Sequence, residues 1–482
     1  MLTRTATDVI FRSAGAPLVS GNHVRILCDA AENYPAWTAA IEHARRTIHL
    51  EMYIVHDDGV GREARDLLTA RARAGVTVRV LYDWFGSLRL SSRRFWRPLV
   101  AAGGEVRAAN RLRADSLFGL LSRDHRKLLA VDGEVAFVSG LCIGDEWMGD
   151  PARGIPPWRD TGLELRGPAV ADAEAAFAAA WGLWGAPVPD GEVPPRTMLP
   201  EAGPVAVRVI ATAPEQAAIY RTDLAVATLA RERFWVTDAY FIGTPPYIEA
   251  LRAAARDGVD VRLLLPERSD IRWIADYSRS LYRPLLEAGV RVFEWSGSMV
   301  HAKTAVADGR WARIGSSNLN LASWIANWEL DVAIEDDTVA KEVEAIFVRD
   351  LVNATEIVIT ERNRVRPTHL HRPAVPRTGG PSGSANRMLA DVTAMRQVLG
   401  AAVKGYRVLG RTEASSMALL ALAILVLAAV LAWLPRLLVY PVVVLLVWEG
   451  VALLVKAWRL RRGGDARPGA TASRGEGVGD GG

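Results

Sequence analysis

The sequence is poor in cysteine and in net charge. It contains two cysteines, Cys28 and Cys142, in 482 residues, and two thiols cannot build a disulfide framework or a structural zinc site. The formal net charge is +4, too small for the field of a dedicated nucleic-acid binder. The first residues also lack the apolar stretch of a signal peptide. We therefore expect free thiols on the cytoplasmic side, no metal and no nucleic-acid partner.

Lysine is also scarce. Of 58 basic residues, only five are lysines. Lysine and arginine are not interchangeable as phosphate ligands, because one is a compact point charge and the other a planar fork. The positions that kept lysine are therefore candidates for a binding site. They are Lys127, Lys303, Lys341, Lys404 and Lys456.

The region from about residue 20 to residue 355 contains an internal duplication. The segments IHLEMYIV and RAGVTVRVLYD are matched later by FWVTDAYFI and RDGVDVRLLLP. Each copy alternates a β-branched run, an amphipathic helical stretch and a second apolar run, which is typical of βαβ units. We predict a duplicated α/β domain with mixed sheets flanked by helices. Its two lobes, residues 1–195 and 196–364, are expected to face one shared cleft.

Each lobe contains the same short motif, a histidine, a lysine two residues later and an aspartate five residues after that. Given how rare histidine and lysine are in this chain, chance predicts far fewer than one such match. The doubled motif therefore indicates a functional site. The six residues are His125, Lys127 and Asp132 in the first copy and His301, Lys303 and Asp308 in the second.

This motif suits the chemistry of a phosphodiester. Alternate residues of a strand point to one face, so the histidine and lysine of each copy are expected to project together into the cleft. The lysines would stabilise negative charge on the phosphoryl oxygens. One histidine would attack phosphorus, and the other would protonate the leaving oxygen. We therefore expect no cofactor.

Residues downstream of each motif support a phosphate site. Ser316 and Asn318 follow the second motif, and the Asn318 amide is expected to donate to a phosphate oxygen. Asp160 and Glu329 occupy equivalent places before apolar strands. We expect their carboxylates to accept the second ring N–H of the histidines and so determine the tautomer. The alternative is that both are surface carboxylates at strand starts.

The C-terminal part has a different composition. Residues 365–411 combine a Pro/Gly/Ser-rich linker with a basic stretch that fits a surface-lying amphipathic helix or an ordinary connector helix. Two apolar runs within 412–462 predict a transmembrane helical hairpin, with two buried core helices as the alternative. The basic residues that flank the hairpin place the catalytic domain on the cytoplasmic side. A disordered tail is expected over 463–482.

On these motifs, from about residue 23 to residue 350, the chain resembles the phospholipase D superfamily and specifically the bacterial cardiolipin synthases. The resemblance implies a two-lobed fold and a ping-pong reaction through a phosphohistidine. It implies His125 as the nucleophile and His301 as the acid and base, although the residues alone leave this order open. It also implies phosphatidylglycerol as a substrate, cardiolipin as the product, and a multi-pass protein of the bacterial inner membrane.

Two departures from the family keep other interpretations open. Cys142 stands where the family commonly has asparagine, and the predicted hairpin follows the catalytic domain instead of preceding it. A phospholipase D-type hydrolase or another phosphodiesterase would share the chemistry up to the phosphohistidine. A membrane protein that only binds anionic lipid is a third interpretation. The sequence does not determine the oligomeric state.

Overall fold

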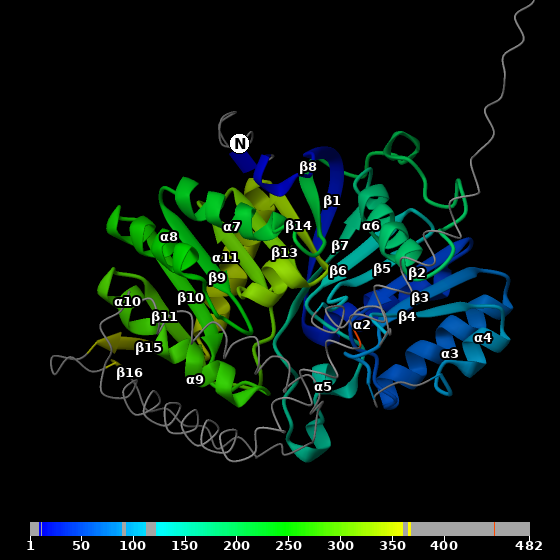
Figure 1. The fold of residues 1–482 in the computed structure, drawn as a ribbon, viewed down its shortest axis with the longest axis horizontal. Coiled ribbons are helices and arrows are strands. Elements are labelled where there is room, and N and C mark those ends of the chain that lie inside the picture. The colour runs from blue at the N-terminus through cyan, green and yellow to red at the C-terminus, as the bar shows by residue number, and fades with distance from the viewer. Residues whose placement is uncertain are drawn as a thin grey trace, which may run out of the picture. The chain divides into compact units, whose positions relative to one another are not determined.

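The computed structural model describes residues 9–10, 12–88, 93–111, 122–359, 365–367 and 448. Within these residues the strands form one 16-stranded sheet (Figure 1). The strands of the first half are β1 (Val19–Cys28), β2 (Thr47–Met52), β3 (Thr77–Asp83), β4 (Glu105–Ala109), β5 (Lys127–Val131), β6 (Val135–Ser139) and β7 (Thr161–Arg166). Those of the second half are β8 (Val205–Thr212), β9 (Arg233–Thr237), β10 (Asp260–Pro266), β11 (Arg291–Trp295), β12 (Thr304–Ala307), β13 (Trp311–Gly315), β14 (Glu329–Glu335), β15 (Ala354–Ile359) and β16 (Val365–Pro367).

The strand order repeats on the two sides of the sheet. From the centre outwards the first half runs β1-β7-β6-β5-β2-β3-β4, and the second half runs β8-β14-β13-β12-β9-β10-β11 before β15 and β16 extend the edge. The outer strands β2, β3 and β4 are parallel, as are β9, β10 and β11, whereas the inner pairs of each half are antiparallel. The predicted duplication and the mixed sheet are both confirmed.

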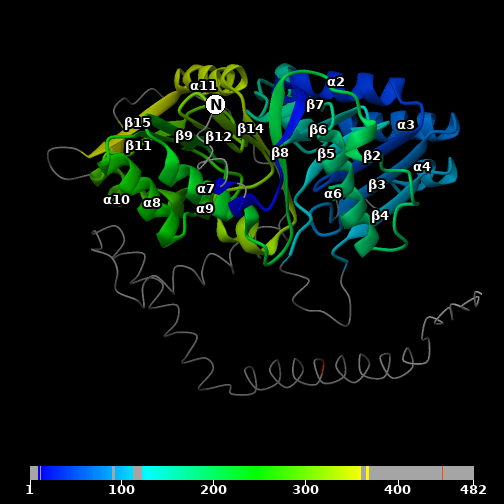
Figure 2. The same ribbon diagram turned by 90° about the horizontal axis from the view of Figure 1, so that it is seen from above.

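Helices cover both faces of each half, so each half has three layers (Figure 2). In the first half, α2 and α3 lie on the face opposite α6. In the second half, α11 lies on the face opposite α7, α8 and α10. One apolar core runs from α6 across the central strands to α11. Two further large cores and one small cluster beside α9 lie under the remaining helices. The helices are α2 (Asp29–His43), α3 (Gly59–Arg73), α4 (Arg97–Ala101), α5 (Asp145–Met148), α6 (Val170–Leu183), α7 (Ala218–Leu229), α8 (Pro245–Arg256), α9 (Arg272–Ser280), α10 (Tyr282–Glu287) and α11 (Asp337–Leu351).

The helix-to-strand turns show how the sequence repeat becomes a structural repeat. Gly75 follows α3 and Gly258 follows α8, with φ angles of 90° and 89°. Residues with a side chain rarely adopt this left-handed conformation, whereas glycine does so without strain. Each turn directs the chain straight into a buried parallel strand, β3 or β10. The matching segments RAGVTV and RDGVDV therefore encode the same turn.

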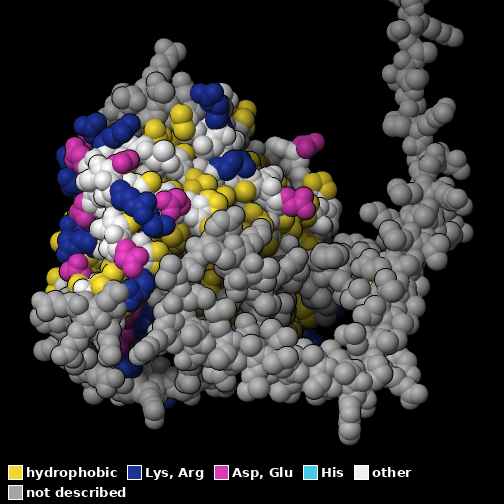
Figure 3. Space-filling model, turned by 60° about the vertical axis from the view of Figure 1, so that its left-hand side comes forward, with side chains coloured by type: hydrophobic (Ala, Val, Ile, Leu, Met, Phe, Trp, Pro, Cys, Tyr) yellow, Lys and Arg dark blue, Asp and Glu magenta, His cyan; other side chains and the backbone are white. Residues whose placement is uncertain are grey.

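Charges of both signs are interspersed on the described part of the surface that faces the viewer in Figure 3. On α8, Glu249 pairs with Arg252 at 2.5 Å and with Arg256 at 3.2 Å. On α10, Arg283 pairs with Glu287 at 3.4 Å. This mixture agrees with the small net charge of the sequence.

The predicted membrane hairpin at 412–462 lies outside the described residues, apart from Trp448. The linker and basic stretch at 365–411 lie outside them too, apart from Val365–Pro367, and so does the tail. Among the residues that are described, no helix is both long and apolar enough to cross a bilayer. The predicted boundary between the lobes at residue 195 falls in the connection between α6 and β8.

Candidate active site

The two motif histidines lie just before their strands, in segments that cross to the opposite half. We expected each histidine and lysine to share a strand, but β5 begins at Lys127 and β12 at Thr304. The backbone N–H of His125 donates to the carbonyl of Trp328 at 2.9 Å, and that of His301 donates to the carbonyl of Arg159 at 2.6 Å. The histidines are therefore held by backbone hydrogen bonds to the opposite half, and not by a regular strand of their own half.

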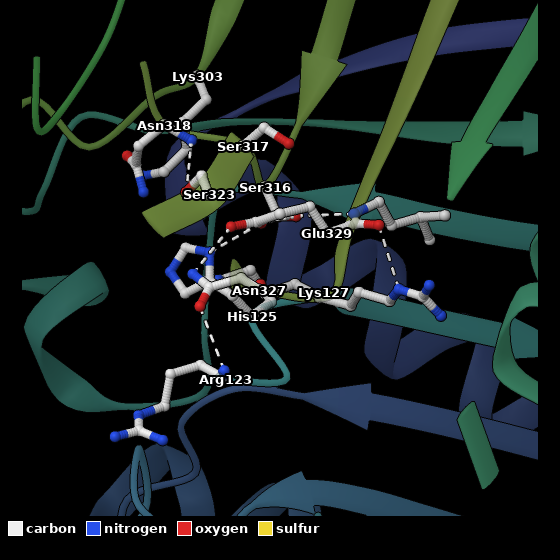
Figure 4. Close-up of polar contacts among 12 residues, drawn as sticks. Arg123, His125, Lys127, Lys303, Ser316, Ser317, Asn318, Ser323, Asn327 and Glu329 are labelled. Atoms are coloured by element: carbon white, nitrogen blue, oxygen red, sulfur yellow. Dashed lines mark hydrogen bonds and ion pairs between the residues drawn. The ribbon is translucent and has the colours of Figure 1, made fainter. Parts of the chain in front are cut away.

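Each histidine forms a hydrogen bond with a carboxylate of the opposite half. Nδ1 of His125 lies 2.9 Å from Oε2 of Glu329 (Figure 4). Nδ1 of His301 lies 2.7 Å from Oδ2 of Asp160. Both carboxylates are fully buried. A proton on Nδ1 leaves the Nε2 lone pair of each ring available for reaction.

The pKa values of the two histidines and the two carboxyl groups agree with these hydrogen bonds. Burial, assisted by Lys127 and opposed by Glu329, lowers the pKa of His125 to about 4. Burial and the neighbouring Lys303 lower the pKa of His301 to about 3. Burial alone would raise the pKa values of Asp160 and Glu329, but their histidine partners, the motif lysines and further hydrogen-bond donors together outweigh burial and lower both pKa values. At neutral pH the free site therefore holds two neutral imidazoles and two carboxylates.

Glu329 is held by two further side chains (Figure 4). Oγ of Ser316 donates to Oε2 of Glu329 at 2.6 Å, and Nδ2 of Asn327 donates to Oε1 at 3.3 Å. Ser316 also accepts from the backbone N–H of Leu330 at 2.9 Å. The structure thus directs the Ser316 hydroxyl at the orienting carboxylate. Sequence reasoning missed the contact of Asn327, although this residue lies only two positions before Glu329.

Asp160 has a different set of partners. Nε1 of Trp147 donates to Oδ2 of Asp160 at 3.3 Å, and the backbone N–H of Thr161 donates to Oδ1 at 2.8 Å. A Cβ atom on Gly140 would lie 2.2 Å from Oδ1 of Asp160, so only glycine fits there. Gly140 occupies the position that Ser316 occupies in the second half. Sequence reasoning did not find these contacts either.

The two motif lysines lie in the same buried region. Lys127 is 1% exposed and Lys303 is 0% exposed. Nζ of Lys127 donates to the His125 carbonyl at 2.5 Å, and Nζ of Lys303 donates to the His301 carbonyl. Burial, opposed by Asp160, lowers the pKa of Lys303 to about 8. Each ammonium group retains donors for a phosphoryl oxygen, because a lysine has three.

Asn318 and Cys142 occupy equivalent positions after their motifs and are both buried. The Asn318 backbone N–H donates to Oγ of Ser323 at 3.2 Å, and its side-chain Oδ1 has no hydrogen-bond partner among the described residues. Burial raises the pKa of the Cys142 thiol, which is therefore protonated. The two halves thus present an amide on one side and a small neutral thiol on the other.

The motif aspartates lie away from the histidines, at the far ends of β5 and β12. The Asp132 carboxylate accepts the backbone N–H groups of Arg45, Arg46 and Thr47 at 2.7–2.8 Å. Asp308 accepts the three equivalent groups at the start of β9. Both aspartates have positive φ angles, 59° and 53°. The geometry therefore ties these aspartates to the neighbouring strand start, and the structure does not bring them to the imidazoles.

Comparisons with known proteins agree with this arrangement. The family described as "Cardiolipin synthase, PLD-like domain" matches residues 37–144 and 224–351. The chain is 35% identical over 361 residues to the cardiolipin synthase of Halalkalibacterium halodurans, covering 73% of this chain and 71% of that protein. It is 36% identical over 359 residues to cardiolipin synthase A of Pseudomonas fluorescens, covering 73% of each.

A solved structure shares the fold. Phosphatidylserine synthase of Haemophilus influenzae superposes with a TM-score of 0.59 at 13% identity, over 82% of this chain and 99% of that one. At this identity the likeness supports the fold alone. Together with the sequence matches and the doubled motif, it shows that the chain belongs to the phospholipase D-like family of bacterial cardiolipin synthases.

Proposed function

We propose that this protein transfers phosphatidyl groups between phospholipids through a phosphohistidine intermediate, and that its product is cardiolipin made from phosphatidylglycerol. The observation that carries the proposal is the pair of histidine–carboxylate hydrogen bonds that cross between the halves. They present two reactive imidazoles beside two buried lysines in one site. The naming of the relatives as cardiolipin synthases supports the choice of substrate.

In the first step, Nε2 of His125 attacks phosphorus and the bond from phosphorus to the glycerol oxygen breaks. The negative charge of the bound phosphodiester favours the imidazolium form of His301, which gives its proton to that oxygen. Glycerol leaves and the phosphatidyl group stays on His125. Asp160 stabilises the imidazolium form of His301, as a carboxylate does in a hydrolytic triad.

In the second step, a hydroxyl of another phosphatidylglycerol gives its proton to His301 and its oxygen attacks phosphorus. The bond to His125 then breaks and cardiolipin forms. Lys127 and Lys303 stabilise the equatorial oxygens in both transition states, and the Asn318 amide donates to one of them. Asp132 and Asp308 stabilise the starts of the neighbouring strands β2 and β9.

The substrate would be taken from a bilayer. The predicted hairpin at 412–462 and the basic residues around it support attachment to the inner membrane, with the catalytic domain on the cytoplasmic side. His125 is assigned as the nucleophile because the resemblance to the family implies this role for the histidine of the first motif.

The test is lipid analysis of a cardiolipin-free bacterial host that expresses the full chain. Thin-layer chromatography and mass spectrometry should show cardiolipin with the wild type and none with His125→Ala or His301→Ala. His43→Ala changes an exposed histidine and is the matched control that should keep activity. Only His301→Ala should accumulate the covalent adduct.

Other outcomes of this test separate the alternatives. Phosphatidic acid in place of cardiolipin would reassign the protein as a hydrolase. An unchanged lipid profile, with folded protein in the membrane, would contradict the enzymatic proposal and favour a lipid-binding protein.

A further inference from the structure

The half that contains His125 buries a charged group that the other half lacks. When the two motifs are aligned, Asp124 and Arg126 correspond to two apolar residues in the second half. Glu51 corresponds to a threonine. This follows from the strand registers, in which Glu51 pairs with Leu128 and Thr237 pairs with the equivalent Thr304. The catalytic mechanism above uses none of these residues. The corresponding sets are Glu51, Asp124 and Arg126 in the first half and Thr237, Val300 and Ala302 in the second.

Arg126 links the two halves directly behind the site. Its Nε donates to the backbone carbonyl of Glu329 at 3.1 Å, and its Nη2 donates to the carbonyl of Thr212 at 3.2 Å. Its Nη1 donates to the carbonyl of Ala176 in α6 at 2.9 Å and lies 3.6 Å from Oε1 of Glu51. The guanidinium therefore holds the backbone of the same residue whose carboxylate orients His125.

Glu51 and Asp124 are buried side by side with too little positive charge for both. They are 0% and 3% exposed. No donor group of another described residue hydrogen-bonds to their carboxylate oxygens, and the side-chain hydrogen bond of each carboxyl group is to the other. Burial raises the pKa of both groups, and for Asp124 the neighbours Glu51 and Asp83 add to the rise while Arg126 opposes it. A second buried negative charge is costly without a partner, and a proton held between the two carboxyl groups would remove that cost.

Asp124 is also part of the segment that places the histidine. Its backbone N–H donates to Oδ2 of Asp83 at 2.9 Å, and it forms a bridge with Trp328 beside Glu329. The contacts thus form one continuous group, made of the two carboxyl groups, Arg126 and the backbone of residue 124. This group links β2, the segment that carries His125 and the start of β14.

We propose that Glu51, Asp124 and Arg126 are positioning residues for His125, which keep the histidine and Glu329 in register through a proton shared between the two carboxyl groups. This inference rests on the proposed function for its readout. It explains why the charged group occurs in only one half: it supports one histidine of the pair, and the other histidine is supported by Arg159, which binds Asp350 at 2.9 Å.

The test compares isosteric and apolar variants of the full chain on phosphatidylglycerol vesicles. Glu51→Gln and Asp124→Asn keep a hydrogen-bonding group and should retain kcat within about threefold. Glu51→Leu and Asp124→Val should lower kcat about 10- to 100-fold, the size expected from a small misplacement of a catalytic group, while KM stays within about twofold. The rate of phosphohistidine formation on His125 should fall by the same factor.

A matched control comes from the same strand. His49 lies two residues before Glu51, on the same face of β2, and its ring contacts Glu192 at 2.9 Å. Glu192→Gln disturbs a charged contact of this strand without touching Arg126, so it should lower the melting temperature and leave kcat unchanged. Infrared difference spectra of the wild type against Asp124→Asn should show the carbonyl band of a buried protonated carboxyl group.

The outcomes are distinct from those of the proposed function. A wild type without turnover contradicts the proposed function. A wild type with turnover and a folded Glu51→Leu variant with unchanged kcat overturns the positioning role. If Glu51→Leu does not fold, the kcat of Asp124→Val relative to Asp124→Asn decides, and equal values overturn it. Absence of the carbonyl band overturns the shared proton.

Discussion

The two halves of the sheet have the same strand order but hold their orienting carboxylates differently. In the second half, Glu329 receives hydrogen bonds from two side chains, those of Ser316 and Asn327. In the first half, the shorter Asp160 approaches the backbone so closely that the residue equivalent to Ser316 must be Gly140. A duplicated scaffold can therefore preserve the geometry at the two imidazoles while the groups behind them diverge.

A second difference lies further from the site, where α6 and α11 cover the sheet. His49 stacks on Phe177 with ring centroids 4.6 Å apart, and Trp235 stacks on Phe347 at 5.3 Å. The first contact adds a titratable group to the core, whereas the second is apolar. The two lobes should therefore respond differently to pH although they share one fold.

The largest expected effect comes from removing either orienting carboxylate. Glu329→Gln and Asp160→Asn keep the side-chain size but present an amide to the imidazole, which favours the wrong tautomer. We expect kcat to fall by roughly 10³- to 10⁴-fold for each, as in triad enzymes. Single-turnover kinetics with trapping of the phosphohistidine measures the effect. A loss below tenfold in either variant would contradict the assigned role of that carboxylate.

An intermediate effect is expected from exchanging the groups behind the carboxylates. Gly140→Ser gives the first half the residue of the second, but its Cβ would lie 2.2 Å from Asp160. We expect this overpacking to cost about 1–3 kcal/mol of stability and to displace Asp160, so that kcat falls. Thermal unfolding and kinetics on the purified chain measure both effects.

The reverse exchange is the control for this comparison. Ser316→Gly removes the hydrogen bonds of the hydroxyl with Glu329 and with the Leu330 N–H without overpacking, and a typical net hydrogen bond contributes about 1 kcal/mol. It should therefore lower stability without displacing its carboxylate by a steric clash, which separates lost hydrogen bonds from overpacking. If Gly140→Ser proves as stable as the wild type, the close approach of Asp160 is wrong.

The smallest effect concerns the pH dependence of stability in the first lobe. Burial lowers the pKa of His49, but its hydrogen bonds to Glu174 and Glu192 outweigh burial, and the pKa is raised. A raised folded-state pKa adds stability that is fully present below the unfolded value of about 6.5 and is lost as the pH rises through the folded value. The wild type should therefore lose stability between mildly acidic and alkaline pH.

The variant His49→Gln should lack this component of stability. Thermal unfolding of both proteins across this pH range measures it. Trp235 makes the corresponding stacking contact in the second half and does not titrate. Trp235→Phe should therefore leave the pH dependence of stability unchanged. Parallel pH curves for the wild type and His49→Gln would show that His49 does not titrate with folding.

Several features of the site could be predicted because they are local. The spacing of each motif identified the histidines and lysines, and the repeat identified Asp160 and Glu329 as equivalent. Other features could not be predicted in this way. The strands begin at or after the lysines, so the histidines are held by pairing with the other half. Strand pairing also determined that Asp132 and Asp308 bind the start of the neighbouring strand and not the site.

The sequence by itself determined which chemical groups this protein can offer to a site, since residue type and short spacing specify which groups are available. The tertiary structure decided which groups meet. His125 is 204 residues from Glu329, and His301 is 141 residues from Asp160, and no local periodicity relates positions so far apart. Only the packing of the two halves brings each carboxylate to its histidine, because the partner segments lead into different strands of one sheet.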